Sequence, residues 1–222
     1  MSLGQLNMCA NYLPPRVDQF TSLGLPEPTF DFASEAYPSS NCPIIMDVND
    51  EMVWRQTMFG LVPSWSKDTS ISKHTYNARF ETVSSKPSYR NAWRNGQFAL
   101  VPMAAFYEPN YESGNAERWS IERQDHEPFT VAAIYDTWKS NPDQKIIRSF
   151  SMLTINADIH PLMRRFHKPE DEKRSLVVIP PEHRRDWLHA TEHNIMEFIE
   201  LFDTNSFTAY NSPRPPKPKK TD

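Results

Sequence analysis

Cys42-Pro-Ile-Ile-Met-Asp-Val48 is followed by the pair Asn49-Asp50 and, one residue later, by Met52-Val-Trp-Arg-Gln-Thr-Met-Phe59. Both long segments are rich in the apolar, β-branched and aromatic residues typical of strands. Asn and Asp tolerate the left-handed backbone that a tight turn needs. The stretch therefore predicts an antiparallel β-hairpin.

Further segments of the same character indicate that the hairpin belongs to a larger sheet. We expect strands over Phe98–Val101, Arg118–Ile121, Phe129–Ile134, Phe150–Ile155 and Ser175–Ile179. Turn-forming residues separate these segments, and helical patterning between them is sparse. The sequence thus predicts an α+β fold: a mainly antiparallel, curled or barrel-like β-sheet with peripheral helices.

Two segments are predicted to be helical. Pro15–Leu23 places Val17, Phe20 and Leu23 on one face of a short helix. The second segment follows Pro180-Pro181, and its apolar side chains are expected to face the domain. These are Trp187, Leu188, Ile195, Phe198, Ile199 and Phe202.

Composition limits the class of protein. The 222 residues suit one domain, and a net charge of −4 argues against a surface coated with basic residues. Two cysteines do not resemble a disulfide framework, and no apolar run approaches the roughly 20 residues of a membrane helix. We expect a monomeric, cytoplasmic protein with no membrane partner. Its domain would span residues 9–210, with a removable leader over 1–8 and a disordered Pro/Lys-rich tail over 211–222.

Met8-Cys9 is the first candidate for chemistry. If Met8 is an initiator that is removed, the chain begins at Cys9 with a free α-amine and a thiol on neighbouring carbons. Such a 1,2-aminothiol condenses with aldehydes: the amine forms an imine, and the thiol then closes a thiazolidine ring. Taken alone, a cysteine is more often a small buried hydrophobic residue than a nucleophile.

A local basic cluster lies between Lys73 and Arg94. Cations interleaved with aromatic rings are typical of single-stranded nucleic-acid binding, in which phosphates pair with the cations and bases stack on the rings. A solvated strand face above core aromatics is the alternative. The cations are Lys73, Arg79, Lys86, Arg90 and Arg94, and the rings are Tyr76, Phe80, Tyr89 and Trp93.

Glu108 and two histidines are candidates for proton transfer. Glu108 follows Phe106-Tyr107, and a carboxylate desolvated among aromatic rings suits acid/base chemistry near neutral pH. An exposed glutamate after a strand is the alternative. Either His160 or His167 could shuttle protons or orient that carboxylate, and periodicity does not choose between them.

His189-Ala-Thr-Glu-His193 matches the His-x-x-Glu-His pattern of inverted zinc peptidases. That pattern needs a distant downstream ligand, and only 29 residues follow His193. We therefore expect a solvated helix face here and no metal site.

Together these motifs resemble the SOS-response-associated peptidase (SRAP) family of abasic-site processing proteins, in order from Cys9 to about Trp187. Asn77-Ala-Arg-Phe-Glu-Thr82 is the most specific element. The others are Met8-Cys9, Gly60-Leu-Val-Pro-Ser-Trp65, Phe106-Tyr107-Glu108 and Phe166-His167-Lys168-Pro169.

The resemblance implies a role for each matching residue. Cys9 would form a thiazolidine with the aldehyde of an abasic site in single-stranded DNA, without cofactor or metal. Glu108 would exchange the protons, and His167 rather than His160 would be the histidine, since His160-Pro-Leu-Met resembles the segment upstream of the family motif. The remaining roles concern DNA. Asn77 and Arg79 would contact the backbone and the lesion, Trp65 would be the base-stacking wedge, and Pro38 would be the proline of the substrate loop. From the basic cluster we also expect Arg90 to bind DNA.

Several positions depart from the family pattern. Cys9-Ala10-Asn11 replaces Cys-Gly-Arg, Ser66 replaces a second Trp, and Pro109 replaces the Trp after the glutamate. The segment from Lys168 to Ser175 replaces a compact Arg-Met-Pro. These departures predict a lower affinity for DNA.

The sequence thus favours an enzyme of the DNA-damage (SOS) response that crosslinks itself to abasic sites, with lyase or peptidase activity as further possibilities. It would associate with the nucleoid when bound to DNA, as a bacterial or phage-type protein. Two other classes stay open: a self-processing thiol peptidase in which Cys9 attacks a peptide carbonyl, and a non-covalent single-strand binding module built on Arg79.

Overall fold

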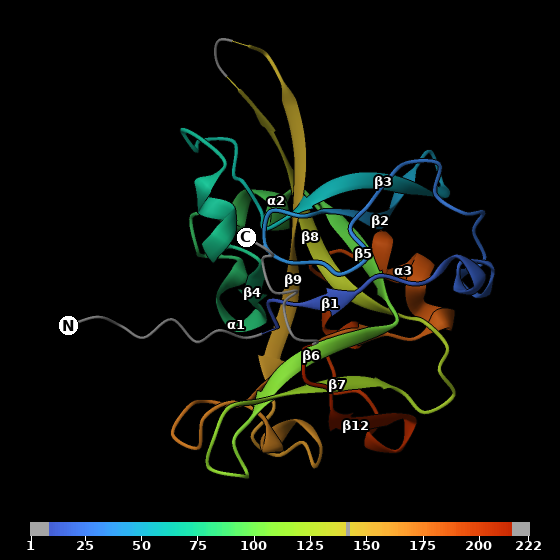
Figure 1. Ribbon diagram of the computed structural model, residues 1–222. Helices are drawn as coiled ribbons and strands as arrows, with labels where there is room; N and C mark the ends of the chain where they lie inside the picture. Colours follow the sequence, from blue (N-terminus) through green and yellow to red (C-terminus); the bar gives the residue numbers. More distant parts are fainter. Residues whose placement is uncertain (1–8, 141–142, 215–222) are drawn as a thin grey trace, which may run out of the picture.

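The computed structural model describes residues 9–140 and 143–214 (Figure 1). Strands dominate this part of the chain, and the helices are short. The strands are β1 (Tyr12–Leu13), β2 (Asn41–Val48), β3 (Glu51–Phe59), β4 (Asn77–Arg79), β5 (Phe98–Met103), β6 (Ala105–Asn110), β7 (Glu117–Arg123), β8 (Phe129–Lys139), β9 (Ile146–Asn156), β10 (Arg174–Leu176), β11 (Val178–Ile179) and β12 (Phe207–Asn211). The α-helices are α1 (Phe80–Val83), α2 (Arg90–Arg94) and α3 (Arg184–Leu188).

The predicted hairpin of β2 and β3 is the start of a closed barrel. The strands pair antiparallel from Asn41↔Met58 to Val48↔Glu51, and Asn49 and Asp50 both have positive φ, as a tight hairpin turn requires. Neighbouring strands run in the order β9-β3-β2-β5-β8, and β8 pairs again with β9 to close the ring. The predicted barrel-like α+β fold is confirmed, and only the contacts of β9 with β3 and β4 are parallel.

A second sheet, β1-β6-β7-β12, packs against the barrel, and both sheets contribute to one hydrophobic core. Its central strand β6 was not predicted, because Glu108-Pro109-Asn110 resembles a loop after an apolar strand. Only Ala104 separates β5 from β6. This short connection leads the chain from the barrel into the sheet that carries Glu108.

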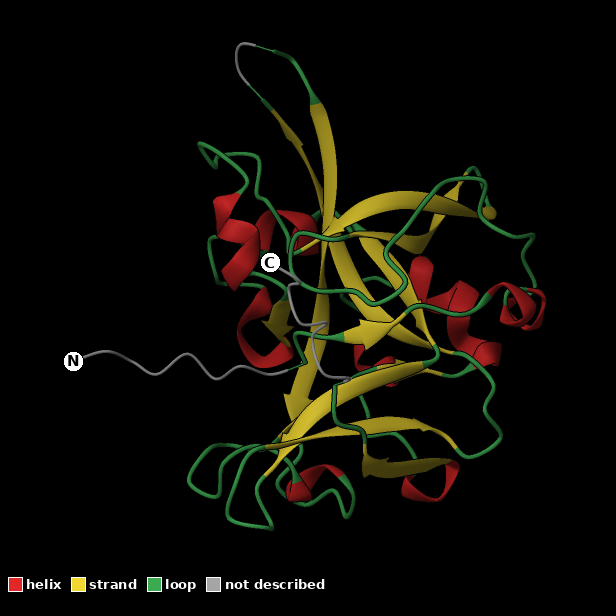
Figure 2. Ribbon diagram, in the orientation of Figure 1, coloured by secondary structure: helices red, strands yellow, loops and turns green. Residues whose placement is uncertain are grey.

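The helices lie at the periphery of the strands, as predicted (Figure 2). The expected helix at Pro15–Leu23 is instead two 3-10 turns, η1 (Val17–Gln19) and η2 (Thr21–Leu23), with Phe20 and Leu23 buried but Val17 exposed. After η5 (Pro181–His183), α3 buries Trp187 and Leu188 and η6 (Ile195–Phe198) buries Ile195 and Phe198 against the barrel. The remaining 3-10 turns are η3 (Ser70–His74), η4 (Met163–Arg165) and η7 (Thr204–Ser206).

The C-terminal segment is ordered beyond the expected boundary at residue 210. Asn211 is the last residue of β12 and pairs with Trp119, and Ser212 N–H donates to Arg118 O at 2.9 Å. The predicted division into leader, domain and tail stays a prediction, because residues 1–8 and residues 215–222 lie outside the described part of the chain. Among the described residues, no helix has the length and hydrophobicity needed to cross a membrane.

Gly60, directly after β3, is predicted to be indispensable for the fold. Its φ is +99°, and a Cβ there would lie 2.1 Å from Ser72 O. Gly60→Ala should therefore lower the free energy of unfolding by more than about 4 kcal/mol, measured by urea denaturation. Gly114→Ala is the control: φ is +86° with open space around it, so strain alone should cost about 1–2 kcal/mol. Equal losses in the two variants would contradict this account.

Candidate active site

Cys9 and Glu108 meet beneath the surface although 99 residues separate them. Strand β1 runs antiparallel to β6, with Tyr12 opposite Phe106, so the chain before β1 passes along Glu108. The Cys9 N–H donates to Glu108 Oε1 at 2.9 Å, and both side chains are buried. In a chain that begins at Cys9, the same nitrogen is the α-amine. The carboxylate is therefore placed to take a proton from that amine.

His167 lies on the other oxygen of the same carboxylate. Its Nε2 is 3.1 Å from Glu108 Oε2, a charge contact whose geometry falls short of a hydrogen bond. His167 has φ of +66°, which is unusual for a non-glycine residue. Its N–H donates to Pro109 O, and neighbouring Phe166 forms a β-bridge with Asn110 at the end of β6. The end of β6 thus holds the strained backbone that turns His167 toward Glu108.

Burial and the Glu108 charge set the protonation of both neighbours. Desolvation raises the pKa of the Cys9 thiol well above its ordinary value, and the negative charge of Glu108 raises it further. For His167, burial alone would lower the pKa, but the charge of Glu108 and its contact with the imidazole raise it above the ordinary value. The resting site therefore holds a neutral thiol and favours a protonated imidazole beside a carboxylate.

Asn77 approaches Cys9 from the barrel. It opens β4, which runs parallel to β9, and its Nδ2 lies 3.4 Å from Cys9 O. Its Oδ1 is buried without a hydrogen-bond partner, an arrangement that proteins generally avoid. This orphaned acceptor belongs to a side chain that contacts Cys9, and it is available to a further hydrogen-bond donor.

His160 has a different environment from His167. Its Nδ1 accepts the N–H groups of Leu162 and Met163, and its Nε2 lies 2.9 Å from Phe202 O. Both ring nitrogens are thereby occupied, and the imidazole packs on the Phe202 ring. Of the two histidines that the sequence left open, the structure brings only His167 to Glu108.

Arg79 is already paired. Its Nη1 lies 2.7 Å from Glu172 Oε2, with about a third of each side chain exposed. Glu172 also accepts from buried Arg174, which makes a second ion pair with Glu81 of α1. These four side chains form a continuous chain of ion pairs that joins the Asn77–Thr82 motif to the segment from Lys168 to Ser175. Any DNA phosphate that binds Arg79 must compete with Glu172.

The other predicted DNA contacts lie on the surface. Trp65 is 53% exposed, and its loop is tied down because Trp65 Nε1 donates to Pro87 O and Trp138 Nε1 donates to Ser66 O. Pro38 is half-buried in the loop before β2. Arg90 is exposed at the start of α2 and has no ion pair within residues 9–140 and 143–214. None of these three touches Cys9 or Glu108 through a hydrogen bond in the described residues.

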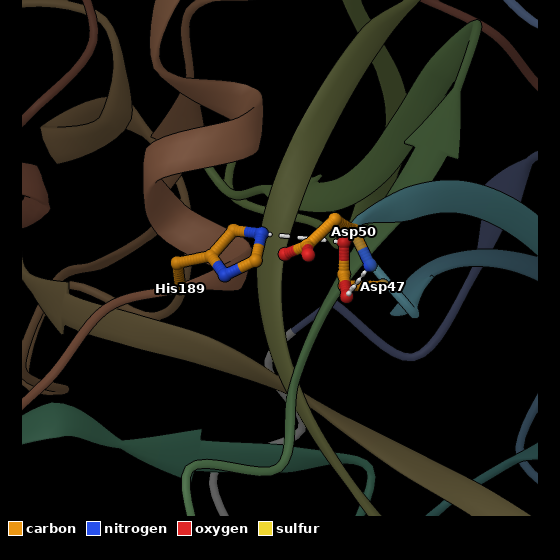
Figure 3. Close-up of side chains that lie close together, drawn as sticks. All are labelled: Asp47, Asp50 and His189. Atoms are coloured by element: carbon orange, nitrogen blue, oxygen red, sulfur yellow. Dashed lines mark hydrogen bonds and ion pairs between the residues drawn. The ribbon is translucent and has the colours of Figure 1, made fainter.

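His189 serves the packing of α3 on the barrel. Its Nε2 lies 3.2 Å from Asp47 Oδ2, and Asp50 stands beside this pair at the β2–β3 turn (Figure 3). Ligand atoms of the three side chains fall within 4.8 Å of one another, but His193 is exposed and outside the group. Asp47 also accepts the N–H of Asp50. The group links the end of α3 to the β2–β3 hairpin through the ion pair of His189 with Asp47. His193, the second histidine of the His-x-x-Glu-His pattern, is not part of it.

Comparison with protein families shows which family the chain belongs to. The family model described as SOS response associated peptidase (SRAP) matches residues 16–213. The chain belongs to the SRAP family. The match starts after Cys9, so the position of the cysteine comes from the structure and the sequence motif.

SRAP relatives and solved structures cover most of the chain. It is 24% identical over 208 residues to abasic site processing protein YoaM of Bacillus subtilis, covering 89% of this chain and 86% of that protein. Abasic site processing protein HMCES of Gallus gallus is 26% identical over 149 residues, covering 54% and 44%. A crystal structure of a protein from Bordetella bronchiseptica superposes with a TM-score of 0.85 at 26% identity, covering 93% of this chain and all of that one.

Three residues around this SRAP site were not predicted to act beside Cys9 and Glu108. Tyr76, which was predicted only as a ring of the basic cluster, lies close to Glu108: burial raises the pKa of Tyr76, and the charge of Glu108 raises it further. Arg118 of β7 donates to Asn11 Oδ1, so a cation from another strand reaches the position where the family's arginine is missing. Glu172 was hidden in a charged segment that resembles an ordinary surface loop. Only Tyr76 had a signal, because it precedes the Asn77 motif directly.

The coupling of His167 to Glu108 predicts a titration. By NMR, His167 should titrate above the ordinary histidine pKa of about 6.5, and Glu108→Gln should lower that value. A raised folded-state pKa stabilises the fold below the unfolded pKa, and this contribution is lost as pH rises through the folded pKa. The unfolding free energy of the unmutated protein should therefore fall more over this pH range than that of Glu108→Gln. An unchanged His167 pKa in the variant would show that the two groups are not coupled.

Proposed function

We propose that this protein processes abasic sites in single-stranded DNA by forming a covalent thiazolidine through Cys9. The hydrogen bond of 2.9 Å between the Cys9 nitrogen and Glu108 carries the proposal, because it puts a buried proton acceptor on the atom that must attack an aldehyde. Membership of the SRAP family and the similarity to YoaM, an abasic site processing protein by name, support the substrate. The enzyme would act in the response to DNA damage.

The reaction needs a chain that begins at Cys9. Glu108 takes a proton from the α-ammonium, and the free amine adds to the aldehyde carbon of the ring-opened sugar. The carbinolamine then loses its hydroxyl as water when Glu108 returns the proton, and the protonated imine that forms gives its N–H proton to Glu108, which leaves an imine. The Cys9 thiol adds to the imine carbon, and its proton passes to the nitrogen as the five-membered ring closes. Atoms balance with one water released, and no redox partner is required.

The neighbouring residues have supporting roles in this scheme. His167 can exchange protons with Glu108 through the contact of 3.1 Å. The orphaned Asn77 Oδ1 can accept a hydrogen bond from the ammonium or from the carbinolamine hydroxyl. The raised pKa of the thiol keeps it protonated until the imine has formed, so the amine reacts first.

DNA would reach this site across Arg79, Trp65 and Pro38. Arg79 would bind a phosphate once Glu172 releases it, and the exposed Trp65 ring offers a stacking surface for a base. Arg90 would add a sequence-independent phosphate contact. Since these groups recognise backbone and unstacked bases, single strands should bind better than duplexes.

The proposal predicts that only chains beginning at Cys9 react. Such a protein and one retaining residues 1–8 should be incubated with single-stranded DNA that carries one abasic site. The first should yield a denaturation-resistant adduct whose mass equals protein plus DNA minus one water, and the second should not. Cys9→Ser, which keeps the amine but lacks the thiol, should give only a reversible imine. An equal yield of the ring-closed adduct with the leader attached would refute the mechanism, and hydrolysis of peptides without any adduct would favour the thiol peptidase.

The ion pair of Arg79 with Glu172 predicts opposite effects on DNA binding. Arg79→Ala should weaken binding to single-stranded DNA and reduce the magnitude of the salt slope by about one. Glu172→Gln should tighten binding, because it removes the carboxylate that competes with phosphate. Glu182→Gln on the exposed η5 is the matched control and should leave affinity unchanged. Fluorescence anisotropy over a salt series measures all three, and an unaffected salt slope in Arg79→Ala would remove Arg79 from the interface.

A further inference from the structure

A cavity of about 360 Å³ opens directly beside Glu108. This volume lies in the range of about 300–1,000 Å³ typical of small-ligand pockets. The chain just after Cys9, strand β6, the start of β7 and the segment after β12 form its walls. Its lining residues are Ala10, Asn11, Tyr107, Glu108, Pro109, Ala116, Glu117, Arg118 and Arg214. The cavity therefore adjoins the proposed reaction site, whereas His167 lines a different hollow.

Arg118 gives this cavity a rigid, flat cation. Its guanidinium carbon lies 3.2 Å from the centroid of the Tyr107 ring. Four hydrogen bonds fix it. Nε and Nη2 donate to Asn11 Oδ1 at 3.3 and 3.0 Å, Nη2 also donates to Glu35 Oε1 at 2.6 Å, and Nη1 donates to Ser212 O at 3.0 Å. A guanidinium held in one plane is a surface on which a nucleobase can stack.

The charges around the cavity do not favour an isolated phosphate. Glu35 neutralises Arg118 in an ion pair. Burial would raise the pKa of Glu35, but hydrogen bonds from Tyr37 and Asn11 and the charge of Arg118 lower it below the ordinary value. Glu117 and Glu108 add negative charge to the lining, against one further cation, Arg214. The better occupant is a flat, uncharged group with polar edges.

We propose that this cavity receives the nucleobase of a nucleotide directly next to the abasic site. This inference rests on the proposed function, because the abasic sugar must lie at Cys9 for its neighbour to reach past Glu108. Ala10, Pro109 and Ala116 leave room for the flat face of a base, and Asn11, Glu117 and Arg214 offer hydrogen bonds to its edges. The protein would thus hold the lesion by a base on one side of it.

Base-free neighbours test the proposal. Protein beginning at Cys9 should be reacted under single-turnover, subsaturating conditions with an oligonucleotide that has one abasic site between two adenines. In two further oligonucleotides, a tetrahydrofuran residue, which cannot open to an aldehyde, replaces either the 5′ or the 3′ adenine. Removing the base on one side only should slow adduct formation about tenfold, the effect expected for one stacked base. Removing the base on the other side should have a smaller effect.

Filling the cavity provides the matched variant. Ala116 is exposed and lines the cavity, so Ala116→Phe should occupy it while Cys9, Glu108 and Arg118 themselves stay unmutated. The variant should react equally with the adenine and base-free oligonucleotides on the sensitive side. Asn115→Phe, on the adjacent exposed residue that does not line the cavity, should keep the tenfold difference. Circular dichroism shows whether both variants are folded.

The outcomes are distinguishable. Adduct formation that is equally fast with all three oligonucleotides would overturn the base site and leave the proposed function standing. The same base dependence in Ala116→Phe as in the unmutated protein would place the base elsewhere. A changed salt slope in Ala116→Phe with unchanged base dependence would assign the cavity to a phosphate, also against the proposal. No adduct with any oligonucleotide would refute the proposed function and this inference with it.

Discussion

The buried carboxylate of Glu108 is the group on which the rest of this site depends. A carboxylate withdrawn from water is costly unless it is paired, and here the Cys9 N–H contacts one oxygen while His167 contacts the other. Strand pairing supplies both partners: β1 lays the N-terminal segment along β6, and the bridge between Asn110 and Phe166 brings in the histidine. The strand pairing that builds the small sheet therefore also brings Cys9 and His167 to Glu108.

The barrel contributes a rigid wall on the opposite side. Its closure through β8 and β9 fixes the strand against which β4 lies, and β4 presents Asn77 to Cys9. The same motif continues into Arg79, whose ion pair with Glu172 links the proposed DNA contact to a segment that differs from the family pattern. The site is assembled from four separate parts of the chain, and none of them carries the chemistry alone.

Much of the fold could be predicted because neighbouring residues in the sequence determine the strands and the turn between them. The Asn49-Asp50 turn and the apolar strands on either side determine a hairpin, and four of the five further apolar segments were found as single strands. The fifth, Ser175–Ile179, is divided between two short strands, β10 and β11, which pair with β9 and β8. Strand β6 was missed because a charged residue and a proline, Glu108 and Pro109, are atypical of a strand. Strand β4 has only three residues, too few for an alternating pattern of apolar and polar residues. The family motifs selected Cys9, Asn77, Glu108 and His167, and the structure brings these four together; their roles stay predictions. Periodicity could not separate His160 from His167, since the difference arises from long-range contacts with Phe202 and Glu108. The partners of Arg79 and Arg118 likewise depend on residues more than 80 positions away.

The central claim is that Glu108 exchanges the protons of imine formation. The most direct measurement is a single-turnover time course of adduct formation by protein beginning at Cys9, with and without Glu108→Gln, and with DNA affinity measured separately. The substitution keeps the shape and removes the proton acceptor, so the account predicts a rate lower by about a hundredfold or more, the usual contribution of a general acid or base, with binding nearly unchanged. A Glu108→Gln protein that reacts at the unmutated rate would contradict the account and make Glu108 a structural residue.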